Sequence, residues 1–552
     1  MTLYPFFLHA WFCRRRFVRL LAAVGAVMAT GRADERARPD VAQGVVMMSP
    51  FEVSANRFDF IGWQTYRSPH FVVYSDGGEK TVRPLLREME MLHLASEALW
   101  GQPAPRRAPV VVVLPASSSD WRKLRSRGAV RWQVEVSTFG RFAYCLVAEY
   151  DWEREGAQTL WAALAGLEAN WIGPEPSFAV SKGVSSYFET ATFRENTVTV
   201  GEYNSRVRVL QDLGWMQWSR FFAITSESPE YVRDGPDLRR FMAQSALWVQ
   251  YLLDPAAPER RKNLRQWNAV FAAGWRPPET LFQSLFGLDY SALKTTLWER
   301  TLTGRGAPRR FTFSAEELAF EITVEAAKTK AMRELFVLIQ ILNQRVEASE
   351  EALDSLLGKG LETAALRPLL VEACLNWKRP EAAATLLDEL IAEGDATPES
   401  YAMAAGLRLE RSLGAALAIN GRLSAEDTSL IQSWCEQALA MEPRLVQANE
   451  VSAVAVGWGA SVSPVGIQTL TRRFERLREN GRLDWCLAAL AMTQWRLGDE
   501  REARKVSEYL LQSLAVRAPV KVVARDLLAQ LPEQAEVPSI ETEADAAAGS
   551  GG

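Results

Sequence analysis

Histidine is nearly absent from this chain. Only His9, His70 and His93 occur among its 552 residues, and the stretch from residue 94 to the end contains none. Zinc peptidases of the His-Glu-x-x-His type need two histidines four residues apart, because both must reach the metal from one helix face. The sequence therefore excludes a catalytic site of that type.

Cysteine is also scarce, and its pattern excludes the common cysteine-based sites. The five cysteines include no Cys-x-x-Cys pair, so the sequence contains no zinc ribbon and no thioredoxin-type motif. Cys374, Cys435 and Cys486 lie in apolar helical stretches, where a free cysteine behaves as a small buried hydrophobe. Cys145 lies within an apolar strand, so we interpret it as structural rather than as a nucleophile paired with a histidine.

An excess of basic charge and several ligand motifs are missing too. Lysine and arginine number 63 against 67 acidic residues, a net charge of -4, so we expect no nucleic-acid partner. The chain has no Gly-x-Ser-x-Gly elbow, no P-loop and no Gly-x-Gly-x-x-Gly, so we expect no bound cofactor. Beyond the N-terminus, no run approaches about 18 uninterrupted apolar residues, so we expect no integral membrane span in the mature chain.

The N-terminus has the order of charged, apolar and small residues that is typical of an export signal. Arginines at 14, 15, 16 and 19 precede the apolar run 20–29, and Gly31-Arg32-Ala33 offers small residues for cleavage. We therefore predict a signal peptide over 1–33 and export to the periplasm or cell envelope. The arginines fit an ordinary Sec-type signal or a twin-arginine signal.

The next region mixes strands and helices. β-branched and aromatic residues predict strands at 70–75, 110–114 and 142–148. Helically spaced apolar residues predict helices over 79–100 and 157–171. Residues 34–64 are interpreted as a linker or edge segment.

From about residue 310 onward, alanine, leucine, glutamate and arginine dominate, and strand signals vanish. Helical pairs recur, with short breaks such as Lys378-Arg379-Pro380 and Gly498-Asp499. This pattern resembles degenerate tetratricopeptide repeats, whose helix pairs bury their apolar faces by stacking on neighbours. We predict an all-α repeat domain over 310–532, with a disordered acidic tail at 533–552.

The region 65–305 resembles the peptidase-MA-like (gluzincin-like) domains of bacterial proteins that carry C-terminal tetratricopeptide repeats. The resemblance implies an α+β gluzincin-like domain in front of the repeats. It rests on several blocks in the family's order, at residues 70–75, 79–100, 109–114, 157–161, 178–188 and 241–253.

Active members of that family carry His-Glu-x-x-His on one helix and a further glutamate ligand just before a glycine on a later helix. With Lys182-Gly183 and the lead-in at 157–161 as anchors, the resemblance places the two histidines at Ala162 and Gly166. It places the general base at Ala163 and the third ligand at Lys182. Alanine and glycine side chains cannot ligate a metal, and a lysine ammonium repels a cation. We therefore predict a degenerate site with no metal and no catalytic residues.

Aromatic residues flank this site and admit two interpretations. They fill the core that the zinc shell would have occupied, or they line a retained groove for a peptide or glycan with Lys182 facing an anionic group. Under the second interpretation the candidate binding residues are Trp161, Trp171, Lys182 and Tyr187.

Three functions fit the sequence. The first is a non-catalytic exported binding or scaffold protein whose helical repeats bind a protein or peptide partner. The second is a hydrolase that uses a relocated or unrecognised active site. The third is a regulatory pseudo-peptidase that captures peptides without cutting them. For His70 and His93 we expect a strand-edge position and a helix flank, rather than a metal site.

Overall fold

The computed structural model describes most of the chain after residue 58. The predicted signal peptide, most of the predicted linker, Trp171 and the acidic tail lie outside the described residues. Those described are 52, 55, 59–100, 109–117, 134–137, 145–148, 155–168, 177–202, 206–226, 228–233, 235–272, 277–302, 308–343, 347–413, 419–443, 445–477, 484–513 and 516–532.

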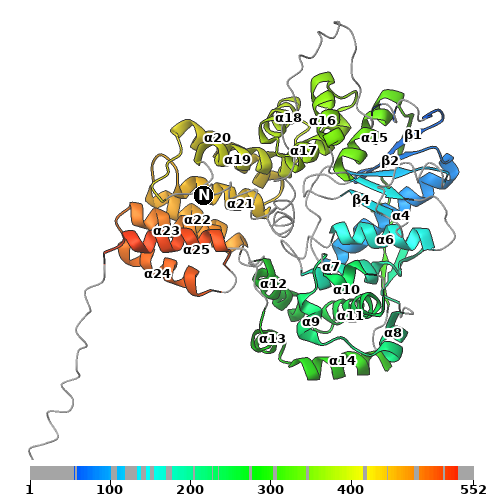
Figure 1. Ribbon diagram of the computed structural model, residues 1–552, viewed down its shortest axis with the longest axis horizontal. Helices are drawn as coiled ribbons and strands as arrows, with labels where there is room; N and C mark the ends of the chain where they lie inside the picture. The colour runs from blue at the N-terminus through cyan, green and yellow to red at the C-terminus, as the bar shows by residue number, and fades with distance from the viewer. Residues whose placement is uncertain are drawn as a thin grey trace, which may run out of the picture.

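A mixed sheet forms the centre of the first half (Figure 1). The strand order is β4-β5-β3-β2-β1-β9, with β2, β3 and β5 parallel and with β1 and β4 antiparallel to their neighbours. The predicted strands at 70–75, 110–114 and 142–148 are confirmed as β2, β3 and β5. The bounds are β1 Gln64–Arg67, β2 Phe71–Ser75, β3 Val110–Leu114, β4 Val134–Ser137, β5 Cys145–Ala148 and β9 Thr323–Ala326.

Both faces of this sheet are buried, as the continuous apolar runs of β2 and β3 require. Val73 and Val112 point to one face, where α4 (Glu79–Trp100) and α6 (Glu155–Glu168) cover them. Val72 and Val111 point to the other face, where α15 (Thr329–Asn343) packs. Figure 1 shows the sheet between α15 on one side and α4 and α6 on the other.

The expectation that strand signals end near residue 310 is wrong. β8 (Arg309–Thr312) pairs with β7, and β9 pairs with β1 at the edge of the main sheet. Most residues of these short strands are polar and none is fully buried, so their sequence resembles that of a solvated loop. The sheet-containing unit thus extends past residue 310, and α15 completes its core.

A second, three-stranded sheet and a set of helices complete the first half. The sheet order is β6-β7-β8. Helix α7 packs against α6 on one side and against α11 on the other. The bounds are β6 Thr192–Arg194, β7 Thr197–Val200, α7 Phe178–Phe188, α8 Arg206–Leu213, α9 Trp218–Ala223, α10 Pro229–Val232, α11 Pro236–Leu252, α12 Glu259–Ala272, α13 Glu279–Phe286 and α14 Tyr290–Leu302.

The rest of the described chain consists of helices that contact one another in successive pairs, α15 with α16, α17 with α18, and onward to α23 with α24. The first of these helices also belong to the sheet's core, so the two halves share one hydrophobic cluster. The bounds are α16 Glu347–Lys359, α17 Arg367–Asn376, α18 Pro380–Glu393, α19 Pro398–Leu413, α20 Ala425–Met441, α21 Val446–Gly457, α22 Pro464–Leu477, α23 Asp484–Arg496, α24 Glu500–Gln512 and α25 Ala518–Gln530; a short 3₁₀ helix spans Ala364–Leu366.

The predicted break at Gly498-Asp499 is confirmed. Gly498 has φ of 86°, which a residue without Cβ adopts readily, and it ends the turn after α23. The carboxylate of Asp499 then accepts a hydrogen bond from the Glu502 N–H and caps α24.

The segment before β1 differs from the expected linker or edge strand. Glu52 and Ala55, its first described residues, are helical and buried. Glu52 accepts hydrogen bonds from Ser355 Oγ at 2.7 Å and from Lys359 Nζ at 2.6 Å on α16. An apparent linker is therefore attached to the helical half.

The described cysteines are free and buried, in agreement with their interpretation as small hydrophobes. Burial raises the pKa of the Cys374 and Cys435 thiols to about 12 and that of Cys486 beyond its usual range. Because the thiolate is the reactive form, we expect a Cys13→Ser variant to react with a thiol reagent at pH 8 only after denaturant is added. Labelling of the native protein within minutes would contradict this burial.

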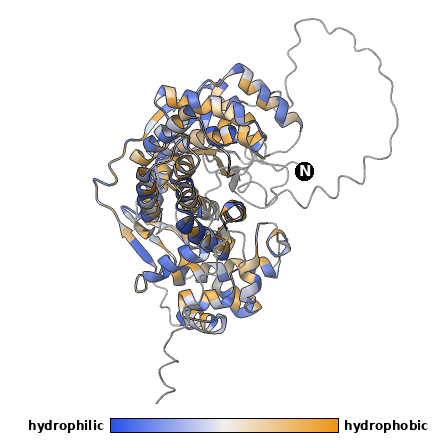
Figure 2. Cartoon of the chain, turned by 90° about the vertical axis from the view of Figure 1, so that its left-hand side faces the viewer, coloured by the Kyte–Doolittle hydropathy of each residue, from blue (hydrophilic) through white to orange (hydrophobic). Residues whose placement is uncertain are grey.

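Among the residues that the structure describes, no helix is long and apolar enough to cross a membrane. Figure 2 shows hydrophobic and hydrophilic residues mixed along most helices, as expected for helices with one buried and one solvated face.

Candidate functional site

The α6 positions that the resemblance assigns to the zinc-binding histidines and to the general base lie on a helix that packs against α7. Ala162, Ala163 and Gly166 are half-buried on α6. A Cβ at Gly166 would lie 2.8 Å from Ser185 Oγ on α7, and Ser185 is one helical turn beyond Lys182. The four assigned positions thus lie on two helices that pack against each other, and their side chains are two methyls, a hydrogen and one ammonium.

Lys182 stacks on aromatic rings. Its Nζ lies 5.3 Å from the ring centroid of Phe178 and 5.3 Å from that of Tyr231 on α10. Those two rings meet edge to face at 4.7 Å, so the ammonium faces two aromatic groups. Such cation–π contacts stabilise a cation without neutralising it. The contacts of the Lys182 ammonium are thus with rings of α7 and α10.

Gly183 allows α7 to approach α11 closely. A Cβ at this position would overlap the backbone carbonyl oxygen of Ser245 and the Cγ2 of Val249. A backbone atom cannot rotate away as a side chain can, so only glycine fits here. Gly183 is thus needed for the packing of α7 on α11, and it directly follows Lys182, the candidate functional residue.

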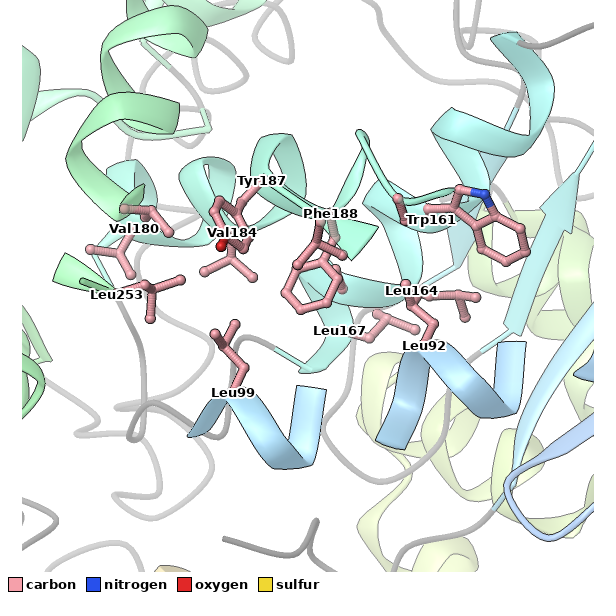
Figure 3. Close-up of a cluster of buried hydrophobic side chains, with 14 of the residues drawn as sticks. Leu92, Leu99, Trp161, Leu164, Leu167, Val180, Val184, Tyr187, Phe188 and Leu253 are labelled. Carbon is pink, nitrogen blue, oxygen red and sulfur yellow. The ribbon is translucent and has the colours of Figure 1, made fainter. Parts of the chain in front are cut away.

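The aromatic residues around the site are mostly core residues. Trp161 is 2% exposed and its ring lies 4.9 Å from that of Phe193. Tyr187 and Phe188 are buried as well, and Figure 3 shows them within a cluster that includes Leu92 and Leu99. Of the two interpretations left open by the sequence, core filling fits Trp161 and Tyr187, since neither exposes enough surface to hold a ligand. Trp171, the remaining aromatic candidate, lies outside the described residues.

The two histidines lie together, unlike the separate positions expected from the sequence. The rings of His70 and His93 stack with centroids 3.8 Å apart. His93 is 3% exposed, so it is a buried residue and not a helix flank. His70 Nδ1 lies 2.6 Å from the carboxylate of Glu90, and Glu97 lies 3.7 Å from His93 Nε2.

Glu90 is a buried carboxylate held by hydrogen bonds. It accepts from His70 N–H, from Ser68 Oγ and from the His70 ring. Burial alone raises the pKa of Glu90, but the hydrogen bonds and charge of His70 outweigh it and hold the pKa below the usual 4.5. The carboxylate thus contributes stability above pH 4.5, which is lost as the pH falls through the lowered pKa.

A His70→Ala variant should therefore be destabilised in a pH-dependent way. We expect a loss of about 2 kcal/mol at pH 7, because a buried carboxylate loses charge-assisted hydrogen bonds, and a smaller loss at a pH below the lowered pKa of Glu90. Denaturant titrations at both pH values measure this difference. Arg83→Ala, which removes an exposed ion pair with Glu79, is the control and should cost less than about 1 kcal/mol. An equal loss from His70→Ala at both pH values would contradict the account.

Within the described residues, no three His, Cys, Asp or Glu side chains are grouped so that they could hold a metal ion. The His70–Glu90 pair supplies two of the groups that a hydrolytic site uses, an imidazole and the carboxylate that orients it. The contact between His70 and Glu90 was not predicted from the sequence. These residues are 20 apart in sequence, and only the packing of α4 on β2 brings them together.

Comparison with protein-family models, curated proteins and solved structures found no match for this chain.

Proposed function

We propose that this protein is a non-catalytic, exported binding or scaffold protein. In this view, a zinc-peptidase-like unit without metal and catalytic residues is joined to helical repeats that bind a protein or peptide partner. The observation that carries the proposal is the set of side chains at the four assigned positions, Ala162, Ala163 and Gly166 on α6 and Lys182 on α7, two helices that contact each other. None of these side chains can ligate a cation or act as a general base at neutral pH.

Two features support peptide binding. Within the described part of the main sheet, β4 has a hydrogen-bonded neighbour on one side only, and it contacts α6. An extended peptide can add to such an edge through main-chain hydrogen bonds. The helical repeats supply a second surface, because stacked helix pairs commonly present an extended face to partners.

Removing everything after residue 310 would not separate the two candidate surfaces, because β8, β9 and α15 complete the sheets and their core. The proposal is better tested with the full mature chain and a defined peptide library, with capture and cleavage both followed by mass spectrometry. We expect some peptides to be retained intact. Loss of capture in Lys182→Ala would assign binding to the α6–α7 contact, and unchanged capture would assign it elsewhere, to the repeats first. Cleaved products without retained peptides would contradict the proposal.

A hydrolase with a relocated active site is the second candidate, favoured by the His70–Glu90 pair. The His70 side chain is 44% exposed, so its outer nitrogen can reach a substrate while Glu90 fixes the ring. If this candidate holds, His70→Gln abolishes any hydrolysis that the wild type shows. Hydrolysis that survives His70→Gln excludes it.

A further inference from the structure

Helix α7 begins at a place where two buried polar groups have no hydrogen-bond partner. Ser177, the residue before its first turn, is 4% exposed, and Asn268 on α12 is 2% exposed. Among the residues that the structure describes, neither the Ser177 hydroxyl nor Asn268 Nδ2 makes a hydrogen bond. Buried polar atoms are normally paired, so two such groups side by side indicate that a further molecule completes this place.

A direct hydrogen bond holds Asn268 at the start of α7. Its Oδ1 accepts from the Ser177 N–H at 3.2 Å. This bond also fixes the orientation of the carboxamide, because a flipped amide would set two donors against each other. Nδ2 is attached to the same carbon as Oδ1, so the unpaired NH2 group lies beside the start of the helix. The neighbouring Trp267 is buried against Phe222, with ring centroids 5.3 Å apart, which anchors this part of α12.

The first turn of α7 adds backbone donors. The Ser181 N–H donates to the Ser177 carbonyl, so the N–H groups of residues 178–180 precede the first hydrogen bond within the helix. The Ser177 side chain does not cap them, and the first turn contains no acidic residue. Ala179 and Val180 are buried, so bulk water is poorly placed to replace the missing acceptor. The start of α7 is thus rich in donors and carries the positive end of the helix dipole.

The one charged side chain of α7 lies near the same end. Lys182 Nζ is 5.3 Å from the ring centroid of Phe178, the first residue of the helix. Phe178 is half-buried, so this end of α7 reaches the protein surface. An anion there would meet neutral donors, the helix dipole and a nearby ammonium, and no acidic side chain of α7 would oppose it.

We propose that the start of α7 binds a carboxylate group of a small ligand. Ser177 Oγ and Asn268 Nδ2 are its side-chain donors, and the N–H groups of the first turn are its backbone donors. A carboxylate fits better than a phosphate, because these donors are neutral and one negative charge costs less to desolvate than two. The inference goes beyond the proposed function, since it holds whether or not the chain binds a peptide.

The test is calorimetric titration of the full mature chain with acetate and, separately, with inorganic phosphate, in a chloride buffer. We expect a dissociation constant of about 10 mM or tighter for acetate, and weaker binding of phosphate. Asn268→Asp should weaken acetate binding at least about tenfold, because it replaces the unpaired NH2 group with a negative charge while it keeps an acceptor for the Ser177 N–H. Ser177→Ala should weaken binding about fivefold.

The matched control is Gln266→Glu. Gln266 is exposed on the same helix, and its replacement changes the net charge as much as Asn268→Asp does. Acetate binding should therefore be unchanged in Gln266→Glu.

Thermal unfolding separates binding from a structural role. Without acetate, Ser177→Ala should melt close to the wild-type temperature, because the hydroxyl that it removes has no partner. Asn268→Asp should melt at or above that temperature, because a carboxylate at this position caps α7. With acetate, the wild type and Gln266→Glu should gain melting temperature and Asn268→Asp should not. The proposal is overturned if acetate does not bind the wild type, if phosphate binds more tightly than acetate, or if Asn268→Asp and Gln266→Glu bind acetate equally.

Discussion

A Gly183→Ala variant should be strongly destabilised. The added methyl would overlap the carbonyl oxygen of Ser245 and the side chain of Val249, so α7 and α11 would have to separate. Overpacking of this kind costs about 1–3 kcal/mol, and we expect the upper end because a backbone atom must move. Denaturant titration with circular dichroism measures the loss.

The matched control is Gly166→Ala on the facing helix. Its added methyl would meet only Ser185 Oγ, at 2.8 Å, and that hydroxyl can rotate away. Alanine also favours a helix interior over glycine by about 1 kcal/mol, so this variant should be neutral or slightly stabilised. If both variants lost the same stability, the close approach of α7 to α11 would not be the reason that Gly183 is needed.

Replacement of Arg517 by methionine should be the most damaging single change in the C-terminal helical region. Arg517 precedes α25 and donates to Asp484 of α23, at 2.7 Å from Nε, and to Glu450 of α21, at 2.5 Å from Nη2. Burial by itself lowers the pKa of Arg517, but the two carboxylates raise it well above its usual range. Without the arginine, two buried carboxylates lose their counter-charge, which costs about 3–5 kcal/mol.

Hydrogen exchange locates this effect, because the loss should appear as faster exchange in α21, α23 and α25 while the main sheet stays protected. Arg379→Met is the control, since Arg379 pairs with Glu350 and Asp354 at the surface and should matter by less than about 1 kcal/mol. The triple variant Arg517→Met, Glu450→Gln, Asp484→Asn should recover part of the stability. No recovery would mean that the arginine acts through packing and not through charge.

The sequence predicted those elements whose signal is local. Helix α4 matches the predicted 79–100 because its apolar residues are helically spaced over a long stretch, and strand β3 matches 110–114 because it is a short, continuous apolar run. It missed β8 and β9, whose residues are polar and half-exposed, since a short strand at an edge depends on its partners more than on its own residues. For the same reason the break expected near 310 does not mark the end of the sheet-containing unit.

The candidate site was predictable only in part. The side chains at Ala162, Ala163, Gly166 and Lys182 can be read from the sequence, but their assignment to a degenerate metal site depends on the resemblance and stays a prediction. The stacking of His70 on His93 is not visible, because the packing of α4 on β2 brings the two residues together.

The central claim is that this chain carries no zinc-peptidase activity, and elemental analysis of the purified mature protein tests it most directly. Zinc per chain should be measured together with cleavage of a broad peptide library, with and without a chelator. We predict no stoichiometric zinc and no chelator-sensitive cleavage. One zinc per chain, with cleavage that the chelator abolishes, would contradict the claim and would point to a site assembled from His70, His93 and nearby carboxylates.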